Sequence, residues 1–273
     1  MTKRLFSVIL IWMKKGLCFF ILSLSALLAN TVQAFDIKGL QPVPPYGVFS
    51  TFSAESLKQN QIGAGIEMER SIDPDFYRAS LKGAYGLHDK FEILFTLPYI
   101  FANKDTGDGI EDVSLGVKHR LLDESDYFPA FAYLLTVSIP SDNDKISTDG
   151  RVGGGLLLTK KIGPFKGHMN LLYIVPGRSE LHNEYDLNLG TELAVTHSSK
   201  ILAELIGRKD FEKGKLNLLE WRLGYRVATA DNIFTTIGAG WNFKNRTPDL
   251  RLMFSVSVIL PFQKPKIQKV YED

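Results

Sequence analysis

Cysteine is almost absent from the sequence, and the one present, Cys18, lies within the first 34 residues. A chain that loses this part has no thiol, which excludes disulfides, thiol catalysis and cysteine metal sites from the remainder. There is no basic block and no basic stretch interleaved with aromatic residues, so nothing indicates a nucleic-acid partner. After Ala34, no apolar run approaches the ~18 residues that indicate a membrane-spanning helix.

Residues 1–34 have the organisation of a secretory signal peptide. They carry four cations and no acid, then the apolar run 16–29, and they end in Val-Gln-Ala at Ala34. Met13, which two lysines follow, is an alternative initiator. A membrane anchor is the other interpretation, but the apolar run is shorter than the ~20 residues of a spanning helix. Removing the four cations from the 32 Lys and Arg leaves 28, against 30 Asp and Glu.

From about residue 60 the chain repeats one pattern, in which apolar residues alternate with polar or small ones and a turn-rich gap follows. Val113, Leu115 and Val117 point one way, for example, while Ser114 and Lys118 point the other. Period-2 alternation indicates β-strands. We predict twelve of them, at about 60–71, 75–87, 90–101, 109–122, 127–139, 149–161, 164–176, 184–197, 199–209, 215–228, 231–243 and 249–262.

The length of these segments and of the gaps between them indicates where they lie. Ten or more residues at ~3.3 Å each cross a bilayer at a tilt near ~45°. Gaps such as 163–164 and 197–199 are tight, whereas 103–109, 141–150 and 209–215 are long and polar. Short periplasmic turns opposite long external loops are typical of outer-membrane barrels, although the external gap at 72–74 is short.

The expected fold is therefore all-β: a transmembrane, antiparallel, up-and-down β-barrel of about twelve strands in the bacterial outer membrane. A soluble β-sandwich is the alternative, but its strands would usually be shorter. We expect the barrel at 59–262 and a polar periplasmic tail at 263–273. Residues 35–58 are irregular and contain prolines that argue against a central strand, so we expect a periplasmic lead-in or a partial plug there.

Charged residues on the opposite register from the lipid-facing side chains are the predicted lumen lining. The strand alternation assigns to it Glu67, Arg78, Lys82, Glu92, Asp112, Lys118, Arg120, Asp186, Glu192, Glu204, Glu220, Arg222, Arg226 and Arg251. Two interpretations stay open, a network of ion pairs that fills the lumen or a polar passage whose charges select a solute. Glycines such as Gly190, Gly224 and Gly238 share this face, where they allow strand curvature or side-chain packing.

The sequence offers no clear catalytic constellation and no metal-ligand spacing. His168 is the one histidine expected to point inward, and no Gly-x-Ser-x-Gly elbow accompanies it. A barrel-embedded lipid hydrolase that uses His168 is therefore a minor alternative. We expect no enzyme activity, no cofactor and no metal.

Three segments resemble one family. Residues 109–122 (GIEDVSLGVKHRLL), 129–140 (PAFAYLLTVSIP) and 83–92 (GAYGLHDKFE) are similar to motifs of the phenol-degradation (MetA-pathway) outer-membrane proteins. That family is regarded as transporter-like, with aromatic or other hydrophobic compounds as its assigned substrates. The resemblance implies an outer-membrane channel or transporter that contacts lipid and carries a small hydrophobic or aromatic solute. It supplies no catalytic or substrate-binding residues. A filled structural barrel without a passage is the other hypothesis.

Overall fold

The computed structural model describes residues 39–72, 75–101, 108–142, 147–179, 181–210, 216–243 and 250–261. The predicted signal peptide at 1–34 and polar tail at 263–273 lie outside this range. Within it, no helix has the length and apolar character needed to span a bilayer.

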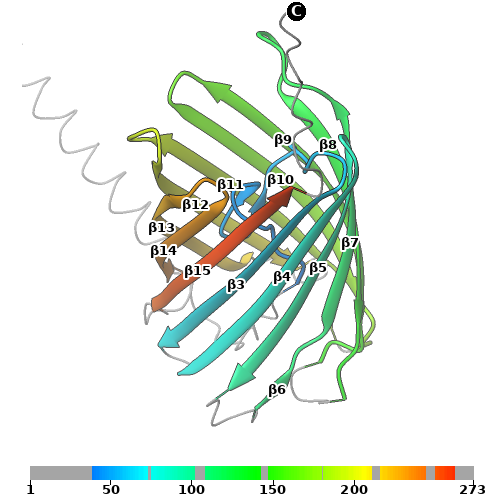
Figure 1. Cartoon of the computed structure of the whole chain (residues 1–273). Helices are drawn as coiled ribbons and strands as arrows, with labels where there is room; N and C mark the ends of the chain where they lie inside the picture. Colours follow the sequence, from blue (N-terminus) through cyan, green and yellow to red (C-terminus); the bar gives the residue numbers. More distant parts are fainter. Residues whose placement is uncertain are drawn as a thin grey trace, which may run out of the picture.

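Twelve long antiparallel strands form a closed barrel (Figure 1). Each pairs with the next along the chain, and the last pairs with the first, so the sheet has no free edge. The strands are β3 (Gln61–Ile72), β4 (Phe76–His88), β5 (Phe91–Phe101), β7 (Val113–Leu122), β8 (Ala130–Ile139), β9 (Arg151–Ile162), β10 (Phe165–Pro176), β11 (Glu184–Ala194), β12 (Ser199–Asp210), β13 (Leu216–Ala230), β14 (Ile233–Asn242) and β15 (Leu250–Pro261). The predicted fold and strand number are confirmed.

The expected strand 109–122 is wrong in one respect, because it is interrupted. Gly109–Ile110 form the short strand β6 against β5, and β7 begins only at Val113. Between them Glu111 and Asp112 are both fully buried. Successive residues of a continuous strand point to opposite faces, so the break is what turns both carboxylates inward.

The barrel carries most of its large apolar side chains outside and most of its strand charges inside. Leu81, Leu135 and Ile237 are among many large apolar residues that are about half exposed on the outer surface. Aromatic pairs lie near the strand ends, such as Trp221 against Trp241 with ring centroids 5.0 Å apart. A closed barrel with an apolar outer band and interfacial aromatics is built to face lipid. The protein is thus a membrane-spanning barrel of the outer-membrane type.

The two ends of the barrel differ in their connections. At one end, the short-turn end, two residues join β4 to β5, β9 to β10 and β13 to β14. The other end, the long-loop end, carries among others the connections at 140–150 and 177–183. The connection after Ile72 is short although it lies at the long-loop end.

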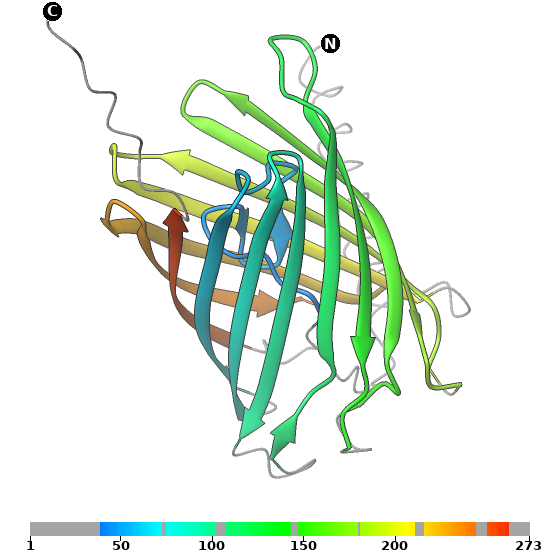
Figure 2. The ribbon, with the colours of Figure 1, turned by 45° about the vertical axis from the view of Figure 1, so that its right-hand side comes forward.

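Residues 39–58 lie inside the barrel, and we call them the inner segment (Figures 1 and 2). Gly47–Val48 (β1) and Thr51–Phe52 (β2) pair as a small hairpin in its middle. Its apolar side chains pack against inward-facing wall residues in two clusters. The smaller cluster joins Val48 and Phe49 of the segment to Leu202 and Met253 of the wall. The segment leads directly into β3 at the short-turn end, where the Asn60 amide donates to the Gly86 carbonyl.

Candidate lumen site

Thirteen of the fourteen predicted lumen residues are buried within the barrel. They are Glu67, Arg78, Lys82, Glu92, Asp112, Lys118, Asp186, Glu192, Glu204, Glu220, Arg222, Arg226 and Arg251. The fourteenth, Arg120, lies at the short-turn end with its side chain 20% exposed, and its Nε is 3.1 Å from Asp123 Oδ1. The structure connects most of these charges in ion pairs.

One group of ion pairs joins β3, β4 and the strand break. Lys82 Nζ lies 2.6 Å from Glu67 Oε2. Arg78 bonds Glu69 at 3.1 Å through Nη1 and Glu111 at 2.7 Å through Nε. Buried charges are tolerated only when they are paired and hydrogen-bonded. These pairs are made entirely by the barrel wall.

A second group continues around β12, β13 and β15. Arg222 Nε is 2.5 Å from Glu220 Oε1, and its Nη1 is 3.3 Å from Glu204 Oε2. Arg251 joins Glu220 at 3.3 Å to Glu69 at 3.0 Å and so links this group to the first. A belt of alternating charge therefore crosses the seam between β3 and β15.

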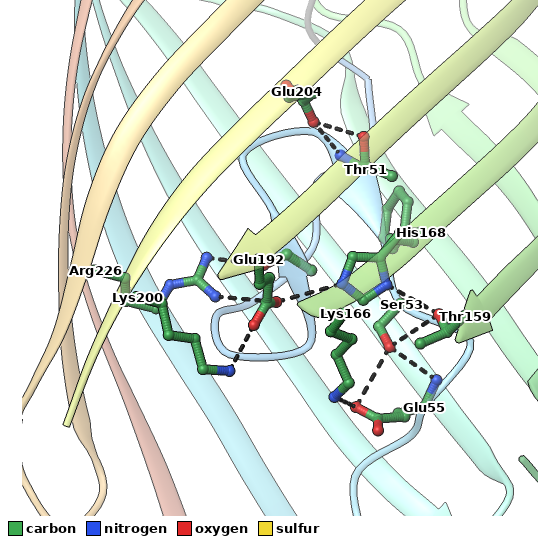
Figure 3. Close-up of polar contacts among 12 residues, drawn as sticks. Thr51, Ser53, Glu55, Thr159, Lys166, His168, Glu192, Lys200, Glu204 and Arg226 are labelled. Carbon is green, nitrogen blue, oxygen red and sulfur yellow. Dashed lines mark hydrogen bonds and ion pairs between the residues drawn. The ribbon is translucent and has the colours of Figure 1, made fainter. Parts of the chain in front are cut away.

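Glu204 is also the main polar anchor of the inner segment (Figure 3). Its Oε1 accepts hydrogen bonds from the amides of Ser50 and Thr51, at 2.8 and 2.6 Å, and from the Thr51 hydroxyl at 2.7 Å. On β10, Asn170 satisfies both backbone groups of Phe52: its Oδ1 accepts from the amide at 2.6 Å, and its Nδ2 donates to the carbonyl at 2.9 Å. The wall thus supplies the backbone partners that the hairpin would otherwise lack.

A third pair, Lys118 and Glu92, contacts the next part of the inner segment. The two charges are 2.8 Å apart. Lys118 Nζ also donates to the carbonyls of Ser53 and Glu55, while Glu92 accepts from the Leu57 amide at 2.8 Å. The same two charged groups therefore pair with each other in the wall and bind the backbone of the inner segment.

His168 belongs to a chain of hydroxyl, imidazole and carboxylate (Figure 3). Thr159 Oγ1 lies 2.9 Å from His168 Nδ1, and Nε2 lies 3.4 Å from Glu192 Oε1. Lys200 and Arg226 also pair with Glu192. This order is that of a nucleophile, base and acid. Here, however, the Ala54 amide occupies the threonine oxygen at 2.8 Å and all three side chains are buried, so the arrangement holds the inner segment.

Inward glycines leave room for side chains of the inner segment. A Cβ on Gly238 would lie 2.5 Å from Phe49 Cε1, and one on Gly224 would lie 2.5 Å from Phe49 Cζ. A Cβ on Gly190 would lie 3.1 Å from the Cβ of Thr51. Real carbon atoms pack at about 3.5–4.0 Å. The wall therefore fits the hairpin only because these positions lack side chains.

Asp112, at the long-loop end, organises a loop. It accepts hydrogen bonds from the hydroxyls of Ser147 (2.6 Å) and Thr148, and from the amides of Thr148 (3.0 Å) and Ser141. Burial raises the pKa of Asp112, but these hydrogen bonds outweigh that effect and bring the pKa below its usual value. The predicted lining residue thus fixes the loop between β8 and β9.

A cavity of about 80 Å³ lies between the inner segment and the wall in the long-loop half of the barrel, and we call it the cup. Gly39, Leu40, Gln41, Ser50 and Phe52 of the inner segment line it. Its wall comes from β8 to β13: Leu134, Thr136, Ser138, Arg151, Gly154, Leu172, Ile174, Asp186, Asn188, Ile206, Arg208, Leu218 and Arg222. On the side of the cup away from the long loops, the inner segment packs against the wall in its two apolar clusters.

Within the described ranges, no three His, Cys, Asp or Glu side chains come together as a metal site. Most of the buried charged groups described above pair with one another or bind the inner segment. This arrangement can hold a polypeptide inside the barrel. It also presents a small cup, lined by apolar and charged side chains, in the long-loop half of the barrel.

Solved outer-membrane porins have a similar fold. The NanC porin superposes with a TM-score of 0.58 at 10% sequence identity, over 71% of this chain and 98% of that one. The KdgM porin, in a structure described as a complex with disordered oligogalacturonate, gives a TM-score of 0.51 at 10% identity, over 74% and 99%. No protein-family model and no curated protein sequence matches the chain. These likenesses agree with the outer-membrane barrel fold derived from the structure.

Proposed function

We propose that this protein is an outer-membrane channel or transporter whose lumen is closed by the inner segment. Solute enters the cup from the long-loop side and crosses when residues 39–58 move aside. The observation that carries this proposal is that the cup ends on the inner segment, which contributes Ser50 and Phe52 to its lining. In this view the segment is a plug.

The distribution of ion pairs supports a plug that can move. The pairs Lys82–Glu67 and Arg208–Asp186 involve only wall residues and do not depend on the segment. Glu204 would keep Arg222 as a partner after releasing Thr51. Since an uncompensated buried charge is strongly destabilising, a wall whose charges pair among themselves can survive displacement of the segment.

For the solute we propose a small aromatic or other hydrophobic compound, as the resemblance to the MetA-pathway family implies. The apolar part of the cup lining, which includes Leu172, Ile174 and Leu218, is compatible with such a solute.

The second candidate function is a filled structural barrel. It is favoured by the burial of Val48, Thr51 and Ala54, each with 0% exposure. A lipid hydrolase built on His168 is a weaker alternative, because the Ala54 amide occupies the hydroxyl that would act as nucleophile.

An engineered disulfide separates the channel from the filled barrel. Thr51→Cys with Gly190→Cys would join the hairpin to β11, since the two Cβ positions are 3.1 Å apart and a small shift reaches the ~3.5–4.5 Å of a disulfide. Ser114→Cys with Ser138→Cys is the matched control, because it links paired residues of two wall strands. The predicted mature chain has no other thiol.

The measurement is conductance of the refolded protein in planar bilayers under oxidising and reducing conditions. We expect the Thr51–Gly190 pair to conduct only when reduced and the control pair to conduct equally in both. Equal conductance of the oxidised and reduced Thr51–Gly190 pair would refute a moving plug. Absence of conductance and solute uptake both in the full chain and in a variant lacking 39–57 would establish the filled barrel.

A further inference from the structure

The outward register of the wall carries few charged side chains, and in the described strands all of them are positive. Among the strand residues that alternate with the lumen lining, the charged ones are Arg70, Lys160 and Lys209, and no carboxylate shares their register. Each lies within two residues of the end of its strand. A charge facing hydrocarbon is costly, and a long cationic side chain near a strand end reaches instead for the headgroup region. The outer wall therefore presents positive charge only where lipid headgroups lie.

Lys160, at the short-turn end, has its partners within the protein. Its ammonium group donates to the carbonyls of Ser125 and Asp126 and lies 3.5 Å from Glu124 Oε1. It thus fixes the loop between β7 and β8 against β9. The two cations at the long-loop end need a different explanation.

Arg70 lies among aromatic side chains at the long-loop end of β3. Its Cζ is 5.3 Å from the centroid of the Tyr77 ring, and Tyr77 stacks on Phe101 with 5.4 Å between the ring centroids. Its Nε is 3.7 Å from Asp75 Oδ1, and these two side chains are 46% and 58% exposed. Such an exposed ion pair contributes little stability. A guanidinium has five N–H donors, so this single long contact leaves donors for another acceptor.

Lys209 repeats this arrangement on another part of the wall. β15, β14 and β13 separate its strand, β12, from β3. Lys209 is exposed and pairs in register with Tyr185 on β11, whose ring centroid lies 4.9 Å from that of Tyr173. Tyrosines are enriched at the membrane interface, where the ring contacts acyl chains and the hydroxyl reaches water. Since short turns face the periplasm in such barrels, both cations lie at the headgroup level of the external leaflet.

We propose that Arg70 and Lys209 are two binding sites for the phosphate groups of lipids in the external leaflet. The phosphate accepts hydrogen bonds from the guanidinium or ammonium group, which are the two cations that proteins use to bind phosphate. The acyl chains pack on the apolar outer wall beside each cation, as on Leu252, which pairs with Arg70 and is 45% exposed. The sites lie on the outer surface, so they go beyond the proposed channel and do not depend on whether the lumen opens.

The test is titration of the refolded full-length protein with lipid in an uncharged detergent, with bound lipid counted by native mass spectrometry. The two probes are the same acylated glucosamine disaccharide with and without its phosphate groups. We expect the phosphorylated lipid to bind each site roughly fivefold tighter, since one cation near an anionic lipid surface is worth about that factor. Inorganic phosphate at the concentration of the lipid should not displace it.

Four substitutions locate the phosphate. Arg70→Gln and Lys209→Gln should each weaken the phosphorylated lipid roughly fivefold at one site and leave the unphosphorylated lipid unchanged. Asp75→Asn removes the carboxylate that competes for Arg70, so it should strengthen binding of the phosphorylated lipid, a gain that an Arg70 serving only Asp75 would not give. Lys161→Gln is the matched control, because it removes an exposed cation at the short-turn end, and it should bind like the parent protein.

Three results would overturn the inference. Equal affinity of the parent protein for the phosphorylated and unphosphorylated lipids would do so without any variant, so the test does not depend on the folding of the variants. Unchanged affinity in a folded protein that carries both Arg70→Gln and Lys209→Gln would do so as well. Displacement of the lipid by inorganic phosphate would show sites for free anions instead of lipid. Lipid binding and bilayer conductance are separate measurements, so a protein that never conducts can still bind the phosphorylated lipid.

Discussion

Gly238 on β14 is the position where one added methyl group should displace the inner segment. In Gly238→Ala the new Cβ would lie 2.5 Å from Cε1 and 2.6 Å from Cζ of Phe49, and 3.1 Å from the Leu223 carbonyl oxygen. Normal carbon contacts are about 3.5–4.0 Å, so the ring must retreat by about 1 Å. Because Phe49 packs against Leu202 and Met253, the retreat disturbs the whole hairpin.

The expected cost is about 1–3 kcal/mol, the usual range for overpacking a well-filled core. At about 1.4 kcal/mol per tenfold, the equilibrium between docked and undocked inner segment shifts by between about 5- and 150-fold. Hydrogen exchange measured by mass spectrometry reports this directly. Amides of the hairpin, such as that of Thr51, should exchange faster by that factor, and amides of the wall strands should be unchanged.

Two further variants decide whether the effect acts through the ring. Phe49→Leu removes the atoms that the new methyl group meets, so it should largely abolish the effect of Gly238→Ala in a double-mutant cycle. Gly153→Ala is the control, since its Cβ would meet the Tyr173 carbonyl at 2.9 Å and the side chains of Thr136 and Ile174 at 3.2 and 3.3 Å, all of them wall atoms. An equal effect of Gly238→Ala with and without Phe49→Leu would refute the argument and implicate the Leu223 carbonyl.

Three other predictions follow from the polar contacts. Glu204→Ala removes the acceptor of three hydrogen bonds and should increase exchange at the Thr51 amide by at least tenfold, whereas Glu204→Gln should have a smaller effect; equal effects of the two would contradict an acceptor role. Asn170→Ala leaves both Phe52 backbone groups without their side-chain partner and should destabilise docking of the inner segment by about 1–3 kcal/mol. In hydrogen exchange at rising temperature, the inner-segment amides of this variant should begin to exchange at a lower temperature than those of the parent protein. Because the pKa of Asp112 is lowered in the folded protein, its carboxylate stabilises the loop between β8 and β9 above the unfolded pKa, and this contribution is lost as the pH falls through the folded pKa. Proteolysis of that loop should rise on acidification in the parent protein, and a parallel rise in Asp112→Asn would show that another group titrates.

The strands could be predicted because each one alternates apolar residues, which face lipid, with polar or small residues, which face the lumen. The strand break at Glu111 was missed although the sequence carries a trace of it, because in the register of Val113 and Leu115 a continuous strand would turn Glu111 toward lipid. Its cause is distant in sequence: Asp112 binds Ser147 and Thr148 from the loop after β8. A local pattern carries no trace of such a partner.

The irregular stretch before β3 was predictable as something other than a wall strand, but its contacts were not. Thr51 and Phe52 bind through backbone atoms to Glu204 and Asn170, more than 100 positions away. Backbone hydrogen bonds leave no signature in side-chain identity. The inward glycines were the one available signal, since Gly238 lies on the lumen face and meets Phe49.

The apolar residues of the cup lining were also missed. Leu134 and Leu135 are adjacent and equally apolar, so hydropathy does not say which one faces lipid. The structure buries Leu134 inside and leaves Leu135 56% exposed. The register of Thr136 and Ser138 on the same strand places Leu134 on the lumen face, so this signal was present in the sequence.

The seam between β3 and β15 also has a consequence for the order of folding. It pairs Gln61 with Pro261, so it joins the two sequence ends of the barrel and carries the highest contact order of any strand pair in it. Loop-closure entropy makes such a contact late and slow to form. The inner segment continues directly into β3, and Ser257 on β15 donates to its Pro44 carbonyl. Formation of this last seam therefore encloses the inner segment, so the segment takes part in barrel assembly as well as occupying the finished barrel.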